Sequence, residues 1–237
     1  MSAGMTAIKG STVLVTGGNR GIGKALVEEF LARGAAKVYA TARDPRTVTA
    51  SGAVGLPLEV TDPASVAALA EAAPDVTILV NNAGIATGTS YLTSPVEEIR
   101  REFEVNFYGP LHLTRAFVPV LEANGGGHLL NVHSALSWLA HGGAYAATKA
   151  ALWSQTNALR LDLRSRGVVV TGLHVGWVDT EMAAAYDVPK VSPVDVATAA
   201  VDGVEADAFE VLADDAARAV KAGLSADLTA LYPELLD

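Results

Sequence analysis

Tyr145 and Lys149 have the residue types and the spacing of an acid/base pair. They stand four residues apart in Tyr-Ala-Ala-Thr-Lys, so in a helix both side chains lie on one face. A phenol with a pKa of about 10 is a poor base at neutral pH, whereas a nearby ammonium group stabilises the phenolate and lowers that pKa. The pair therefore predicts a tyrosine that exchanges a proton with a substrate, although this spacing alone is common by chance.

A glycine-rich segment, Thr-Gly-Gly-Asn-Arg-Gly-Ile-Gly at 16–23, separates the first predicted strand from the first predicted helix. Glycines let the backbone turn sharply and approach a pyrophosphate, which then lies at a helix N-terminus where free N–H groups and the helix dipole favour negative charge. A turn that only packs the helix on the strand is the alternative. The position between strand and helix favours nucleotide binding.

The glycine spacing TGxxxGxG, taken with Tyr145 and Lys149, resembles that of the classical short-chain dehydrogenase/reductase family. The resemblance runs from Val13 to about Met182. It implies an oxidoreductase that moves a hydride between a nicotinamide cofactor and a carbonyl or alcohol. Tyr145 would then exchange the proton at the substrate oxygen, and Lys149 would bind the nicotinamide ribose and tune Tyr145.

Two further catalytic positions follow from the same resemblance. Asn106 matches the helix asparagine that holds a water in the family's proton relay; a capped or kinked helix interior is the alternative. Ser134 matches the second of two serines that usually follow the strand asparagine, and it would polarise the substrate carbonyl. Its separation from Tyr145 is two residues shorter than usual, so Ser137 is the alternative. His133 replaces the first serine, and we expect it to be a packed strand residue because Tyr145 already fills the acid/base role.

The resemblance also implies the residues that bind the cofactor. Glu59 stands where the family usually has an aspartate that contacts the adenine, and the segment at 82–84 matches the motif that shapes the adenine and ribose pocket. The loop after the sixth predicted strand retains Gly176 and Thr180, while Val175 replaces the usual proline. The full predicted set is Gly17, Asn19, Arg20, Gly21, Ile22, Gly23, Arg43, Glu59, Val60, Asn82, Ala83, Gly84, Tyr145, Lys149, Gly176, Val178 and Thr180.

Arginines at two positions indicate NADP(H) rather than NAD(H). Arg43 follows the second predicted strand, where an NAD site usually offers a carboxylate to the ribose hydroxyls. Arg20 in the glycine loop is a second cation for the 2′-phosphate, and paired arginines suit phosphate recognition. Both could instead be solvated surface side chains, and Asp44 could weaken the preference.

A largely apolar and aromatic set of residues is expected around the substrate, which favours a hydrophobic ketone or secondary alcohol. Each member could equally belong to the core or to a subunit contact. The set comprises Leu136, Trp138, Trp177, Met182 and Tyr186, with Ile85 and Leu139 beside them.

These residues must be positioned by the elements that precede them. Valine-rich runs alternate with longer helical patterns, which predicts a single α/β domain over 1–237 with a doubly wound, Rossmann-type parallel sheet of about seven strands and helices on both faces. Strands are predicted at 12–16, 37–41, 53–58, 77–81, 127–132, 168–174 and 209–212. Helices are predicted at 21–33, 63–72, 96–123, 143–166, 193–205 and 214–222.

Composition limits the possible partners. A net charge of −9 argues against nucleic acid, because such binding depends on Lys and Arg displacing counterions from phosphates. No apolar run is long enough to cross a membrane, and Met1 to Gly10 lacks the pattern of a secretory signal, so we expect a cytoplasmic protein. The five histidines are scattered and the chain has no cysteine, so no metal site is expected. Association into a homodimer or homotetramer through the helices at 96–123 and 143–166 follows from the family resemblance.

Two other functional classes remain open. A catalytically silent NADP(H) sensor would use the same glycine loop, but such proteins often lose the tyrosine or the lysine, and both are present here. A sugar-nucleotide epimerase or dehydratase would share the Tyr145 and Lys149 spacing. That class usually has a GxxGxxG loop and a longer C-terminal region. A hydrolase has no support, because no GxSxG motif occurs.

Overall fold

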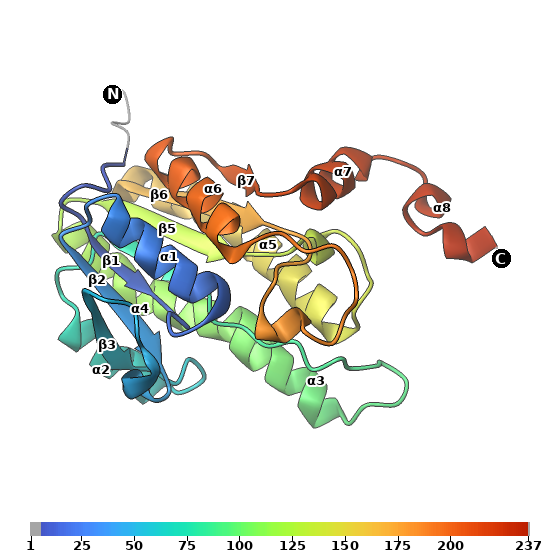
Figure 1. Ribbon diagram of the computed structural model, residues 1–237, viewed down its shortest axis with the longest axis horizontal. Coiled ribbons are helices and arrows are strands. Elements are labelled where there is room, and N and C mark those ends of the chain that lie inside the picture. Colours follow the sequence, from blue (N-terminus) through green and yellow to red (C-terminus); the bar gives the residue numbers. More distant parts are fainter. Residues whose placement is uncertain (1–5, 237) are drawn as a thin grey trace.

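The computed structural model describes residues 6–236, and this part of the chain forms a seven-stranded sheet in the order β3-β2-β1-β4-β5-β6-β7 (Figure 1). Every neighbouring pair of strands is parallel. The predicted doubly wound α/β fold is confirmed. The strands are β1 (Thr12–Val15), β2 (Lys37–Ala42), β3 (Ala53–Pro57), β4 (Ile78–Asn81), β5 (Gly127–Val132), β6 (Val168–His174) and β7 (Glu210–Leu212).

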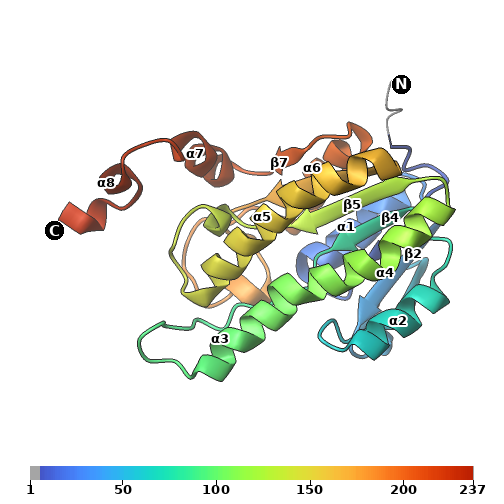
Figure 2. The same ribbon diagram turned by 180° about the vertical axis from the view of Figure 1, so that it is seen from behind.

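Helices cover both faces of the sheet. On one face α1 (Gly21–Ala32) packs beside α6 (Pro193–Glu205), as Figure 1 shows. On the other face lie α2 (Pro63–Ala72), α4 (Gly109–Ala123) and α5 (Ala144–Leu163), which are nearest the viewer in Figure 2. This two-sided cover explains why the central strands read as continuous apolar runs rather than as alternating ones.

Each face of the sheet has its own apolar core. Val13, Val15 and Phe30 belong to the cluster beneath α1 and α6, and all are fully buried. Leu14 and Phe117 belong to the cluster beneath α2, α4 and α5. Burying a side chain of this size contributes about 1.5–3 kcal/mol, so the two clusters stabilise the sheet from both faces.

The strand order reverses between β1 and β4, and the loops leaving their carboxyl ends therefore diverge. A crevice forms at such a switch point in doubly wound sheets, and ligands bind there. The glycine-rich segment follows β1 at this edge, and Asn82 follows β4.

The helix predicted over 96–123 is divided in the structure. It consists of α3 (Val96–Phe103), a π-helical turn (Glu104–Tyr108) and α4. Pro110 has no N–H to donate to the carbonyl of Asn106, which interrupts the regular hydrogen-bond ladder at this turn. Such π turns are frequent at functional sites, and this one contains Asn106.

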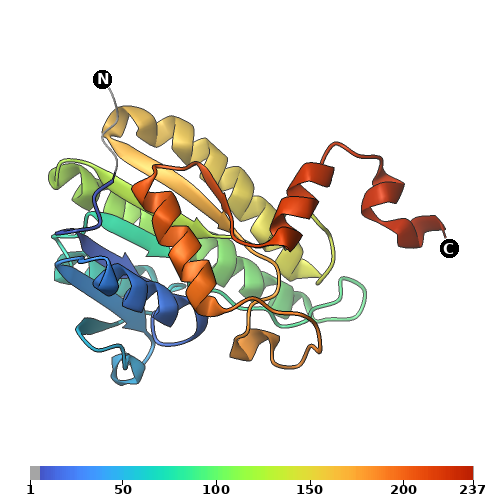
Figure 3. The same ribbon diagram turned by 45° about the horizontal axis from the view of Figure 1, so that its top comes forward.

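The C-terminal segment extends beyond the sheet. It comprises α7 (Asp215–Gly223), α8 (Leu228–Leu231) and a final 3-10 turn (Pro233–Leu236), which project away from the body in Figures 1 and 3. The sequence predicts α7 to within one residue at each end; α8 has only four residues and gives no periodic signal. Within residues 6–236, no helix has the length and apolar character to cross a membrane.

Candidate active site

The sequence-predicted residues come together at the carboxyl edge of the sheet. The glycine-rich segment follows β1, Asn82 follows β4, Ser134 follows β5 and Gly176 follows β6. Because all strands are parallel, the segments that leave β1, β4, β5 and β6 meet at one edge of the sheet.

The glycine-rich segment is held in place by β4. The side-chain amide of Asn82 donates hydrogen bonds to the backbone carbonyls of Thr16 (2.9 Å) and Gly17 (3.3 Å). The hydroxyl of Thr16 in turn accepts from the backbone N–H groups of Asn82 and Ala83, both at 3.0 Å. The loop is therefore a rigid turn locked to its neighbouring strand.

The start of α1 is suited to an anion. A Cβ atom at Gly23 would lie 2.1 Å from the carbonyl oxygen of Gly17, so the close approach of helix and loop requires glycine there. Asp62, Ser192 and Asp214 cap α2, α6 and α7, whereas no side chain among residues 6–236 caps α1. An uncapped N-terminus leaves backbone N–H groups free, and a pyrophosphate fits them. The residues present thus fit a dinucleotide cofactor.

The two arginines predicted to bind a 2′-phosphate differ in their surroundings. Arg43 follows β2 and is exposed. Arg20 forms an exposed ion pair with Glu181, which lies in the 3-10 turn after Thr180. Asp44 is bound by Arg46 at 2.9 Å, and the Arg46 guanidinium lowers the pKa of Asp44. The carboxylate that could weaken an NADP(H) preference is therefore already paired with a cation.

The remaining cofactor positions are also placed along this edge. Asn19 donates to the hydroxyl of Thr47 at 3.1 Å, which ties the glycine loop to the segment after β2. Glu59 accepts from the hydroxyl of Thr61 at 2.9 Å, and Val60 is buried. Gly21 and Ile22 are the first two residues of α1, and Gly84 lies in the loop after β4.

Tyr145 lies in the first turn of α5, and the hydroxyl of Ser134 lies near its phenol. Burial raises the pKa of Tyr145 to about 12, although the Ser134 hydroxyl opposes this shift and the charge of Glu102 adds to it. The predicted lowering of this pKa by Lys149 is wrong, because loss of water around the hydroxyl dominates and raises the pKa. Tyr145 is consequently protonated at neutral pH.

Ser134, rather than Ser137, is the serine beside Tyr145. The hydroxyl of Ser137 accepts from the backbone N–H of Ser134 at 3.4 Å, so it caps the short 3-10 turn at 135–137. This turn accounts for the shortened spacing between Ser134 and Tyr145.

Lys149 is buried one turn further along α5. Its amine donates to the backbone carbonyl of Val132 at 2.8 Å and lies 5.6 Å from the centre of the Tyr145 ring. Burial lowers the pKa of Lys149 to about 8. The amine thus lies next to the tyrosine ring, as the helical spacing predicts.

Asn106 joins three segments around the site. Its side-chain amide accepts from the backbone N–H of Ile85 (2.9 Å) and donates to the carbonyl of Ile85 (2.8 Å). It also donates to the hydroxyl of Thr148 at 3.1 Å. The side chain is fully buried, so the π turn, the loop after β4 and α5 are held together at this point.

The loop after β6 lies against the glycine loop. A Cβ atom at Gly21 would lie 3.2 Å from the methyl group of Thr180. The backbone N–H of Gly176 donates to Asp214 at 2.8 Å, and the buried Val178 pairs with Val191. This loop therefore forms the wall of the crevice opposite the glycine loop.

The predicted substrate residues fall into two groups. Trp177, Met182 and Tyr186 are exposed by 41%, 50% and 47%, and the rings of Trp177 and Tyr186 are 4.5 Å apart. Leu136 and Trp138, together with Leu139, line a groove of about 260 Å³ between the 136–143 loop, α5 and Tyr232.

Trp138 also belongs to a buried ring stack behind Ser134. Its ring stacks on His174 at 4.0 Å, and His174 stacks on His133 at 4.6 Å. His133 is fully enclosed, and burial together with nearby positive charge holds its pKa well below the ordinary value. It is packed and hydrogen-bonded to Thr156, as predicted, but it lies directly after β5 rather than within the strand.

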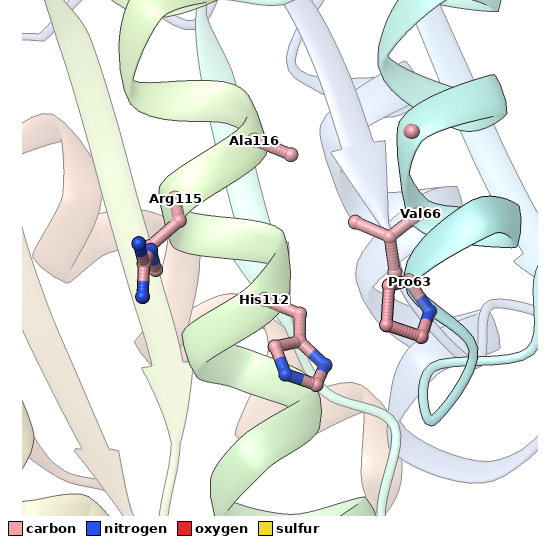
Figure 4. Close-up of a pocket in the computed structure, with 6 residues that line it drawn as sticks. Pro63, Val66, His112, Arg115 and Ala116 are labelled. Carbon is pink, nitrogen blue, oxygen red and sulfur yellow. The ribbon is translucent and has the colours of Figure 1, made fainter.

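A second groove, of about 290 Å³, lies between α2 and α4; His112 points toward Pro63 and Val66 in Figure 4, whereas Arg115 lies on the other side of α4 in that view. None of the predicted site residues lines it. Among residues 6–236, no three His, Asp or Glu side chains gather closely enough to hold a metal ion.

Sequence reasoning missed two charged residues at this site, Glu181 and Glu102. Glu181 pairs with Arg20, which lies 161 residues earlier, so no local pattern could identify it. Glu102 is fully buried near Tyr145. The sequence does contain a signal for Glu102. It lies three residues after Ile99 and four before Asn106, which places it on the same helix face as both.

Comparison with known proteins places these features in a family. The family model for the short chain dehydrogenase matches residues 11–189. The 3-oxoacyl-(acyl-carrier-protein) reductase FabG of Escherichia coli (strain K12) is 34% identical over 189 residues, covering 75% of this chain and 77% of that protein.

Solved structures agree with this similarity. A short-chain dehydrogenase from Burkholderia cenocepacia J2315 in complex with NADP superposes with a TM-score of 0.91 at 35% identity, covering 98% of this chain and 100% of that one. A short-chain dehydrogenase/reductase from Burkholderia phymatum in complex with NAD gives a TM-score of 0.83 at 27% identity, covering 92% and 94%. A pyridine nucleotide is thus bound by both similar proteins.

Proposed function

Because this chain belongs to the short-chain dehydrogenase/reductase family, we propose that it is an NADP(H)-dependent enzyme that reduces hydrophobic ketones or oxidises the corresponding secondary alcohols. The observation that carries the proposal is the grouping of the Ser134 hydroxyl and the Tyr145 phenol with the buried amine of Lys149. These groups lie at the edge where the glycine loop meets the end of β4. The arrangement supports proton transfer next to a bound dinucleotide.

Each residue of the site has its own role in the proposed reaction. The nicotinamide supplies or accepts the hydride when bound. Ser134 donates a hydrogen bond to the substrate carbonyl and orients it, and Tyr145 delivers the proton to the same oxygen. Lys149 holds the nicotinamide ribose and supplies positive charge near Tyr145. In alcohol oxidation Tyr145 takes the proton back.

NADP(H) preference is supported by charge. Arg43 is exposed at the end of β2, and the nearby Asp44 is occupied by Arg46. A cation without a competing free carboxylate suits a 2′-phosphate. The similar Burkholderia cenocepacia protein binds NADP, which agrees with this preference.

A hydrophobic substrate is supported by the residues around the crevice. Trp177 and Tyr186 expose aromatic surface, and Met182 lies between them in sequence. We also expect a cytoplasmic homodimer or homotetramer. Tyr108 and Leu161, on the segments predicted to associate, are exposed by 41% and 80%, which suits a subunit contact.

The test is consumption of NADPH and of NADH with aliphatic, aryl and cyclic ketones, using wild-type protein and Tyr145→Phe. We expect wild type to turn over apolar ketones with NADPH. Tyr145→Phe should lose at least about a hundredfold in kcat while binding NADPH unchanged, since only the proton donor is removed. Tight NADPH binding by wild type without turnover on any ketone or alcohol would instead indicate a cofactor sensor.

A further inference from the structure

Glu102 is a buried carboxylate that the mechanism above does not use. It has no exposed surface, and no Lys or Arg within residues 6–236 lies within salt-bridge distance of it. Its Oε1 accepts from the backbone N–H of Thr87 (2.6 Å) and from the hydroxyl of Thr87 (2.8 Å). Its Oε2 accepts from the hydroxyl of Thr89 at 3.1 Å. Burying a charge without a cation is costly unless hydrogen bonds satisfy it, and here neutral donors do so.

Glu102 and Asn106 together hold the loop that follows β4. They are four residues apart on α3 and the π turn, so both point to the same side. Asn106 binds the backbone of Ile85, and Glu102 binds Thr87 and Thr89. Alternate residues of the loop are therefore fixed to a single helical face.

The same loop fixes the start of α5. The hydroxyl of Thr89 donates to Glu102 and accepts from the backbone N–H of Ala144 at 3.1 Å, and Ala144 directly precedes Tyr145. Gly143 precedes α5 with a φ of 62° and provides no side-chain cap, and a Cβ atom there would lie 1.8 Å from the carbonyl oxygen of Thr89. Thr89 thus supplies the cap that Gly143 lacks.

The charge of Glu102 also acts on Tyr145. Three groups lie near the tyrosine: the charge of Glu102 on α3, the hydroxyl of Ser134 in the turn after β5, and the amine of Lys149 on α5. Burial raises the pKa of Tyr145 most, the Ser134 hydrogen bond lowers it, and Glu102 raises it. A negative charge favours the protonated phenol, which is the form that donates to a carbonyl.

From this geometry we infer that Glu102 is a positioning residue, whose buried carboxylate fixes the first turn of α5 through Thr89 and places a negative charge near Tyr145. The inference rests on the proposed role of Tyr145 as the proton donor.

The charge is tested with Glu102→Gln, which keeps the shape of the side chain. The matched control is Glu104→Gln, the same change on an exposed side chain two residues away. Rates of ketone reduction fall at high pH as Tyr145 loses its proton. In Glu102→Gln this fall should move to lower pH by about 0.5 to 1.5 units, because loss of the negative charge makes the phenolate easier to form. Glu104→Gln should follow wild type. An unmoved profile in a folded Glu102→Gln protein would overturn the inference.

Positioning is tested separately with Thr89→Val, which removes the link to Ala144 and leaves the charge. We expect kcat to fall at least about tenfold. KM for NADPH should stay within about twofold of wild type, and the pH at which the reduction rate falls should not move. Thr89→Ser should restore kcat, because it keeps the hydroxyl. Full activity of Thr89→Val would overturn the positioning role. If Glu102→Gln does not fold, the two Thr89 variants still test the positioning role.

A spectroscopic readout separates this inference from the proposed function. Ultraviolet difference titration against Tyr145→Phe reports ionisation of the Tyr145 phenol and needs no substrate. If wild type turns over no ketone, the proposed function fails, yet the Tyr145 ionisation should still move to lower pH in Glu102→Gln. An identical Tyr145 titration in both proteins would refute the effect of Glu102 itself.

Discussion

The protonation states of Tyr145 and Lys149 are set by how completely water is excluded from them. Burial raises the pKa of the Tyr145 phenol to about 12 and lowers that of the Lys149 amine to about 8. Both shifts favour the neutral form of the group, because an uncompensated charge is disfavoured in a dry environment. The site therefore contains a protonated tyrosine at neutral pH.

Arg43 is the residue whose replacement should change the choice of cofactor. In Arg43→Asp, a carboxylate would repel the 2′-phosphate and accept hydrogen bonds from the ribose hydroxyls of NADH. The ratio of kcat/KM for NADPH to that for NADH should fall at least about tenfold. Arg101→Asp, the same charge change on an exposed position of α3, is the control. An unchanged ratio in Arg43→Asp would show that Arg43 does not contact the phosphate.

Glu181 should compete with NADPH for Arg20. The ion pair joins the glycine loop to the loop after β6, and both side chains are more than half exposed. Exposed pairs contribute about 0.2–1 kcal/mol, so Glu181→Gln should tighten NADPH binding about 1.5- to 5-fold and leave NADH binding nearly unchanged.

Fluorescence titration of this variant measures the dissociation constants of both NADPH and NADH. Glu28→Gln, which breaks an exposed pair with Lys24, controls for net charge. Equal tightening for both cofactors would argue against a phosphate contact by Arg20.

At the scale of elements, the junction of β1 and α1 depends on a close backbone approach. A Cβ atom at Gly23 would lie 2.1 Å from the carbonyl oxygen of Gly17 and 2.5 Å from the amide nitrogen of Asn82. Neither neighbour is free to move, because Asn82 is bonded to Thr16 and Gly17. The helix start and the end of β4 are thus held as one unit.

Gly23→Ala should therefore damage both stability and cofactor binding. Overpacking of this kind costs about 1–3 kcal/mol in the free energy of unfolding, and the displaced loop should weaken NADPH binding at least about tenfold. Urea unfolding and cofactor titration measure the two effects. In Gly223→Ala the new Cβ would meet only Leu231 at 3.6 Å, so this variant should bind NADPH like wild type. Normal NADPH binding by Gly23→Ala would contradict the assignment of this junction as the pyrophosphate site.

At the scale of the whole molecule, buried histidines link folding stability to pH. His128, His133 and His174 lie within or at the end of β5 and β6 and are almost entirely enclosed. Burial lowers the pKa of His128 and of His174 to about 4, and that of His133 well below its ordinary value. Each imidazole is therefore neutral in the folded protein and takes up a proton more readily when unfolded.

The free energy of unfolding should accordingly be highest above about pH 6.5 and should fall as the pH is lowered toward 4. Each buried imidazole contributes a loss of up to about 1.4 kcal/mol per pH unit in this range. Urea unfolding between pH 7 and pH 5 measures the slope. His128→Gln should reduce it, whereas His141→Gln, at an exposed position, should not. Equal slopes in all three proteins would contradict this origin of the pH dependence.

The sequence alone determined the order of strands and helices and most of the site. These features depend on short-range patterns: apolar runs bounded by glycine, a glycine loop at a strand end, and Tyr145 and Lys149 four residues apart. Parallel topology then brings the strand ends to one edge, so residues as distant as Gly17 and Ser134 could be assigned to one site.

Only the tertiary structure decided the surroundings of the predicted residues. The pairing of Arg20 with Glu181, the stack of Trp138 on His174 and the burial of Glu102 beside Tyr145 all join segments far apart in the chain. The direction of the pKa shift at Tyr145 was likewise decided only by the tertiary structure, because it depends on how much water remains around the hydroxyl. The exclusion of water from a group and its distance from charged groups depend on the whole fold, so no local pattern of residues predicts them.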